Sequence, residues 1–204
     1  LAAREGDLDQ AMAHCQAAVK QDAESLQART LRASIALRRG ELVSAGNDLK
    51  FCLEREPKNS VLHADLAQVY LRQGQYAQAL EACAAAMALA PEAMDLRVLE
   101  VELLALEKRQ SDARSALANL KHHLSPLGFD RLAARVEALF GNEAKAVELL
   151  EPHVGKEAAA TVQWALLKFK SHDESAKTLE TLSSQSLAGE QWSSLALAAQ
   201  DNAL

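Results

Sequence analysis

Histidine and cysteine side chains are the first places to look for metal binding or catalysis in this chain. His14 adjoins Cys15, and His122 adjoins His123. Neighbouring residues on a helix point about 100° apart, so neither pair can chelate one ion by itself. A zinc site needs three or four converging ligands, and the sequence has neither an HExxH motif nor a Cys/His cluster. The pattern predicts no metal site and no cofactor.

Nucleophiles and paired carboxylates give no stronger signal for catalysis. The sequence contains no GxGxxG, no Walker loop and no GxSxG. Carboxylates are scattered, as at Glu54 and Glu56, so no acid–base pair can be selected. Cys15, Cys52 and Cys83 lack CxxC spacing. A redox or metal role is one interpretation, but small unpaired cysteines are more often core residues. We therefore expect no catalytic residue.

The clearest pattern in the chain is apolar and helical. Between Ser60 and Glu92, apolar residues recur at helical spacing on both sides of Gly74. Gly74 suits the left-handed end of a helix, and Pro91 stops the helix that follows. Residues 60–92 are thus predicted to form two amphipathic helices. One such hairpin cannot bury both apolar faces, so it needs similar hairpins on either side.

A constant step along the chain supplies those similar hairpins. A step of about 34 residues with a helix–turn–helix per step is typical of tetratricopeptide repeats. Positions related by this step are Gly6, Gly40 and Gly74; Ala11, Ala45 and Ala79; Ala18, Cys52 and Ala86; Arg4, Arg38 and Arg72; and Pro57 with Pro91. The chain resembles this family, most closely at 60–93. There His63 stands where the family often has tryptophan, and one repeat earlier Arg32 occupies the position of Leu66.

The resemblance implies an all-α fold, a right-handed solenoid of stacked helix–turn–helix hairpins with about twelve to thirteen helices. We expect one array over residues 1–204, with repeats at about 1–25 (partial), 26–59, 60–93, 94–126, 127–155 and 156–186. Residues 187–204, which include Trp192, form either a capping helix or the start of a further repeat.

Three local predictions refine this array. The partial repeat is expected to turn at Gly6 before a second helix from Leu8 to Lys20. Lys108 replaces the turn glycine of the repeat at 94–126. Ser111 or Asp112 is expected to cap the next helix, since both types favour that position.

The inner face of the solenoid is the predicted partner-binding site. In the family the first helix of each hairpin lines the concave groove, and a peptide or partner helix usually binds there. The residues assigned to this groove are Thr30, Ser34, Leu37, Arg38, Val61, Ala64, Gln68, Leu71, Arg72, Val98, Glu102, Arg131 and Arg135. The arginines would pair with carboxylates of a ligand, while Asp95 and Glu102 would favour basic residues opposite them.

Two alternatives stay open for the groove residues. They can be merely solvated helix surface, or the outer second-helix faces can bind the partner instead. Some family members hold a C-terminal carboxylate with a clamp of lysine, asparagine and arginine. Thr30, Ser34, Ala64 and Gln68 do not reproduce that clamp.

Composition limits the classes of partner. The formal net charge is −6, and without a basic stripe we expect no nucleic acid to bind. No run approaches about 18 apolar residues, so no membrane-spanning segment is predicted. The unpaired cysteines slightly favour the cytoplasm. A periplasmic location stays open, because the sequence begins at Leu1 without a methionine and a preceding segment is expected. The oligomeric state is not predicted.

These observations favour a non-catalytic scaffold that binds a protein or peptide partner. Assembly of a bacterial envelope, pilus or exopolysaccharide secretion complex is one specific version. The alternative is a regulatory or substrate-docking arm of a larger enzyme.

Overall fold

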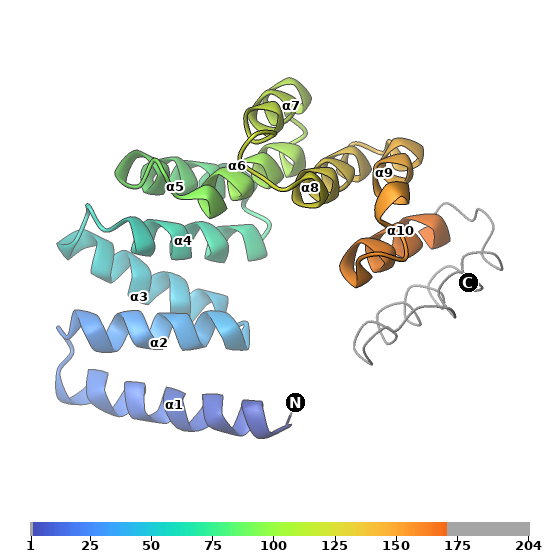
Figure 1. The fold of residues 1–204 in the computed structure, drawn as a ribbon. Coiled ribbons are helices and arrows are strands. Elements are labelled where there is room, and N and C mark those ends of the chain that lie inside the picture. The colour runs from blue at the N-terminus through green and yellow to red at the C-terminus, as the bar shows by residue number, and fades with distance from the viewer. Residues whose placement is uncertain (1, 171–204) are drawn as a thin grey trace. The chain divides into compact units, whose positions relative to one another are not determined.

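The chain folds into helical hairpins in a computed structural model that describes residues 2–170, with side chains described for 8–157 and 160–168. No strand occurs in this part, and the predicted all-α fold of repeated helical hairpins is confirmed. The α-helices (Figure 1) are α1 (Ala2–Gln21), α2 (Leu26–Arg39), α3 (Leu42–Arg55), α4 (Ser60–Arg72), α5 (Tyr76–Leu89), α6 (Met94–Leu106), α7 (Gln110–Asn119), α8 (Pro126–Leu139), α9 (Glu143–Leu150) and α10 (Ala158–Lys170), with a 3-10 helix at Glu151–His153. The helices predicted beyond residue 170, including the one at Trp192, lie outside the described residues.

The chain divides into two compact units, which are described separately. The N-terminal unit is Leu1–Leu103 and the C-terminal unit is Leu104–Leu204. In the N-terminal unit, consecutive helices from α1 to α5 pack against one another in chain order (Figure 1). The first helices α2 and α4 of successive hairpins also contact each other. This packing places α2 and α4 on one side of the unit and their second helices, α3 and α5, on the other.

Short turns and caps define the helix ends. Asn59 caps α4, since its Oδ1 accepts a hydrogen bond from the Val61 amide at 3.1 Å. Gly40 and Gly74 take left-handed backbone at φ 77° and 72°, which glycine adopts without strain. Lys108 takes the same conformation at φ 61°. It therefore replaces glycine in the turn without changing the path of the chain.

Two predictions about helix ends are wrong. α1 is one continuous helix from Ala2 to Gln21, so the chain does not turn at Gly6. Glycine adopts helical backbone as readily as left-handed backbone, and it does not fix a turn by itself. The N-cap of α7 is Arg109, without a side-chain cap, rather than Ser111 or Asp112. Asp112 instead lies in the first turn and pairs with Arg109 at 2.6 Å.

The core of the N-terminal unit consists of two apolar clusters. The first joins α1 to α4 and includes Leu49, Cys52 and Leu62. The second joins α4 to α6 and includes Cys83 and Leu103. Tyr70 packs against both clusters from its partly buried position, as expected for a residue between adjacent hairpins. All three cysteines are buried and unbonded.

In the C-terminal unit, a third apolar cluster joins α8, α9 and α10. Leu150 and Ala160 are fully buried in it, and Trp164 of α10 also belongs to it. α9 ends at Leu150, and Pro152 lies in the 3-10 helix that follows. Proline has no N–H to donate to the helix, which explains why α9 is short.

Candidate partner-binding surface

One face of α2 and α4 collects side chains that the core does not use. On α2 these are Gln27, Leu31, Ser34 and Arg38, and on α4 they are the equivalent Val61, Asp65, Gln68 and Arg72; all are exposed or half-buried. We call these eight residues the first-helix face. Leu31 is 54% exposed and Val61 62% exposed. Exposed large apolar side chains beside polar ones are typical of protein-binding surfaces.

Some residues of the predicted groove are not available on this face. Leu37 is 8% exposed and belongs to the first core cluster, so it cannot offer its side chain to a ligand. The Thr30 hydroxyl points inward and donates to Cys52 Sγ at 3.6 Å. Arg72 stays exposed, but its Nη1 donates to the Leu37 carbonyl at 2.6 Å. Part of its guanidinium is thus used to cap α2.

The remaining predicted residues are spread over both units. Ala64 and Leu71 are half-buried on α4, and Val98 and Glu102 are half-buried on α6. Arg131 and Arg135 are exposed on α8 and belong to the C-terminal unit. Of the residues predicted on α2 and α4, the first-helix face contains Ser34, Arg38, Val61, Gln68 and Arg72. It adds Leu31 and Asp65, which the sequence analysis missed.

Asp65 is the half-buried acidic residue of this face. Burial raises the pKa of its carboxyl group above the ordinary value. Among the described residues, no hydrogen bond or ion pair reaches this carboxylate. A desolvated carboxylate without a partner is destabilising on its own, and a cation from a bound molecule would relieve that cost.

A buried ion cluster lies between α2 and α3. Asp48 is 1% exposed. Arg32 binds it through both Nε and Nη2 at 2.6 Å, and Arg29 reaches it at 3.1 Å. The Arg29 guanidinium also stacks on the Phe51 ring at 3.6 Å. Both carboxylate oxygens of Asp48 accept hydrogen bonds from arginines of the same hairpin, so this cluster is structural.

A second buried carboxylate organises the C-terminal unit. Glu137 on α8 is 5% exposed. It accepts hydrogen bonds from Asn142 at 2.7 Å, Lys145 at 2.9 Å and Arg114 at 3.0 Å. Burial alone would raise the pKa of Glu137, but these three donors outweigh it and lower the pKa to about 2. Glu137 is therefore a fixed anion that joins α7, α8 and α9, and it is unsuited to acid–base catalysis at neutral pH.

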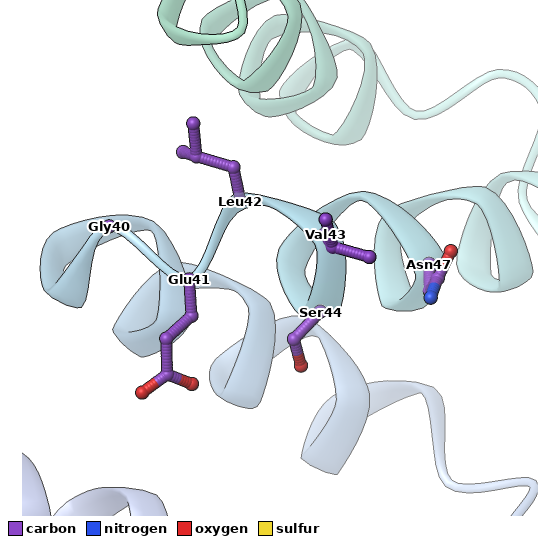
Figure 2. Close-up of a pocket in the computed structure, with 6 residues that line it drawn as sticks. All are labelled: Gly40, Glu41, Leu42, Val43, Ser44 and Asn47. Atoms are coloured by element: carbon purple, nitrogen blue, oxygen red, sulfur yellow. The ribbon is translucent and has the colours of Figure 1, made fainter.

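Two adjoining hollows lie along α3 in the N-terminal unit. The turn hollow, about 610 Å³, is lined by Gly40, Glu41, Leu42, Val43, Ser44 and Asn47. Figure 2 shows that these residues follow one stretch of chain, with Leu42 and Glu41 pointing to opposite sides of it. The α3–α4 hollow, about 210 Å³, is lined by Leu42, Val43, Gly46, Asn47, Lys50, Val69, Tyr70, Gln73, Gln75 and Gln78.

Within residues 2–170, no group of three or more His, Cys, Asp or Glu side chains is placed to hold a metal ion. None of the described helices is long and apolar enough to cross a membrane.

Comparison with known proteins agrees with the helical hairpins. A model of the tetratricopeptide repeat family matches residues 36–92. No curated protein matches the chain. Among solved structures, a tetratricopeptide repeat protein from Parabacteroides merdae has a TM-score of 0.77 at 16% identity, over 98% of this chain and 80% of that chain.

Two further solved structures share the fold at low identity. PilW, a widely conserved type IV pilus biogenesis factor, has a TM-score of 0.65 at 18% identity, over 98% of this chain and 84% of its own. YrrB, a TPR protein with an unusual peptide-binding site, has a TM-score of 0.59 at 21% identity, over 73% of this chain and 77% of its own. Residues 36–92 thus match the tetratricopeptide repeat family, and the chain shares the fold of these solved structures.

Proposed function

We propose that the chain is a non-catalytic scaffold that binds a segment of a protein partner on the first-helix face. The main support for this proposal is the position of the exposed apolar residues of the chain. Among the described residues, four large apolar side chains are exposed, and two of them, Leu31 and Val61, lie on this face. The half-buried Asp65 beside them has no partner of its own among these residues.

The chemistry of this face defines the partner. Leu31 and Val61 supply apolar contact, and aliphatic side chains of the partner would cover them. Gln68 and Ser34 can donate and accept hydrogen bonds. Asp65 favours a lysine or arginine of the partner, since pairing would offset the desolvation of its carboxylate. We therefore propose a partner segment with alternating apolar and basic residues.

A role in a bacterial envelope or pilus assembly is the specific version of this proposal. Its support is the shared fold with PilW, which is described as a type IV pilus biogenesis factor. The same surface also suits a docking arm of a larger enzyme. A partner captured with the intact protein and identified by mass spectrometry would decide between a complex-assembly role and an enzymatic one.

The test uses paired substitutions on and off the face. The double variant L31E/V61E places two charges on the first-helix face. The matched control is L89E, because Leu89 is 40% exposed on α5 and outside the face. We expect L31E/V61E to keep its helicity and lose the captured partner, while L89E keeps it. Equal capture by both variants would remove the first-helix face as the binding site.

A further inference from the structure

The α3–α4 hollow is lined by core residues such as Val69 and by polar side chains around them. Asn47, Gln73, Gln75 and Gln78 are exposed around it. Among the described residues, none of their side-chain amides is engaged in a hydrogen bond. Val43 stands at its edge with 73% of its surface exposed. One hollow therefore combines free amides with an exposed apolar side chain.

The free amides favour an extended peptide over a helix. Each amide offers one acceptor and two donors, which matches the C=O and N–H of a peptide bond. A helical segment satisfies its own backbone groups, whereas an extended segment leaves them without internal partners. A surface rich in free amides therefore gains more from an extended backbone than from a helix.

The size and continuity of the two hollows support the same occupant. The α3–α4 hollow, about 210 Å³, is smaller than the roughly 300–1,000 Å³ of most small-molecule sites. It shares Leu42, Val43 and Asn47 with the turn hollow. The two form a continuous track along the first turns of α3, and Figure 2 shows the Val43 and Asn47 side chains along it. A track suits a chain segment better than a compact molecule.

The charge of Lys50 indicates which residue type the bound segment should contain. Lys50 is the one charged residue among those that line the α3–α4 hollow. Its Nζ lies 5.4 Å from the centre of the Tyr70 ring, which holds the ammonium group at the rim. Glu41, in the turn hollow, is already paired with Arg39 at 2.8 Å. The charge that complements this hollow is a carboxylate.

We propose that the α3–α4 hollow binds an extended segment of another protein, with an aspartate or glutamate at Lys50 and an apolar side chain against Val43. The segment runs along α3 and bonds to the surrounding amides through its backbone. This second site lies between α3 and α4 and reaches the start of α5, and it shares no residue with the first-helix face. It prefers acidic segments, whereas the first-helix face prefers basic ones.

The experiment selects peptides from a phage-displayed library of random short peptides on the intact, folded chain. Each selected peptide is then measured by fluorescence anisotropy against wild type, K50E, V43E and L31E/V61E. The matched control is K58E, since Lys58 is an exposed lysine of the same unit and lies outside both hollows. Circular dichroism confirms that each variant is folded.

We expect a class of acidic peptides that L31E/V61E and K58E bind like wild type. K50E should weaken this class roughly tenfold or more, as loss of a charge-assisted hydrogen bond does. A peptide with lysine in place of its acidic residue should recover binding to K50E. In nitrogen-15 spectra, these peptides should shift the side-chain NH₂ signals of Asn47, Gln73, Gln75 and Gln78.

Three results would overturn the inference: no selected peptide, selected peptides that bind K50E and V43E like wild type, or unshifted amide signals. A selection in which every peptide loses binding only to L31E/V61E would support the first-helix face and reject the second site. Acidic peptides that lose binding only to K50E and V43E would support the second site without the first. The two proposals thus fail separately.

Discussion

Replacing Glu137 by glutamine should make the stability of the chain less sensitive to acid. Glu137→Gln keeps the size of the side chain and an acceptor oxygen for Asn142, but it removes the charge that Arg114 and Lys145 face. The folded protein lowers the pKa of Glu137 from 4.5 to about 2. A carboxyl group whose pKa is lower in the folded state stabilises the fold above its unfolded pKa.

The pKa difference sets the size of the effect. The step from 4.5 to about 2 corresponds to about 3 kcal/mol of unfolding free energy at neutral pH, at about 1.4 kcal/mol per pH unit. The Arg114 and Lys145 side chains are 46% and 56% exposed, so water screens both charges. We therefore expect E137Q to lose about 1–2 kcal/mol at neutral pH.

The measurement is urea unfolding of wild type and E137Q across a pH series, followed by circular dichroism. Hydrogen exchange of the α8 and α9 amides accompanies it, because repeat arrays can unfold in parts. The difference between the two proteins should be complete above pH 4.5 and vanish as the pH falls to about 2. E148Q is the control, since Glu148 is exposed on α9. A difference that does not change with pH would refute this account of Glu137.

Three further outcomes test the packing. Asp48→Ala should cost roughly 3 kcal/mol in urea unfolding, because it leaves the half-buried Arg32 without its carboxylate partner. R32L/D48A should recover most of that loss, and a double variant as unstable as D48A would contradict this. Gly46→Ala should raise stability by about 0.5–1 kcal/mol, since the added Cβ meets only Val69 Cγ1 at 3.5 Å; a lower urea midpoint would show that α3 and α4 cannot accommodate it. Cys83, whose pKa burial raises to about 11, should react with a thiol reagent only when the chain unfolds, and rapid labelling of the native protein would contradict its burial.

The repeat period predicts the helices well where glycine and proline mark their ends. In the repeat expected at 26–59, α2 ends at Arg39, directly before Gly40, and α3 begins at Leu42. Gly40 takes left-handed backbone in the turn between α2 and α3, and these two helices pack against each other. Gly6 lies inside the continuous helix α1. The identity of a residue alone does not distinguish these two outcomes.

The binding face was harder to predict because a helix can rotate without changing its period. The sequence analysis placed Leu37 on the inner face, but the structure buries it and exposes Leu31. Successive residues are about 100° apart around a helix, and packing decides which of them face the solvent. The sequence gives a partial indication of the ion cluster. Arg32 and its partner Asp48 are both charged where the next repeat has the uncharged Leu66 and Ala82.

The Arg32–Asp48 pair has a consequence for how the chain folds. Repeats of similar sequence can exchange partners during folding, so α2 could pack against α5 in place of α3. In that arrangement Arg32 on α2 would meet Ala82 on α5, the equivalent of Asp48 one repeat later. Asp48 on α3 would meet Leu66 on α4, the equivalent of Arg32 one repeat later. Each charge would be buried without its counter-ion, which costs several kcal/mol. We expect the ion pair to select α3 as the partner of α2 and to reject the mispaired hairpin before it forms a stable intermediate.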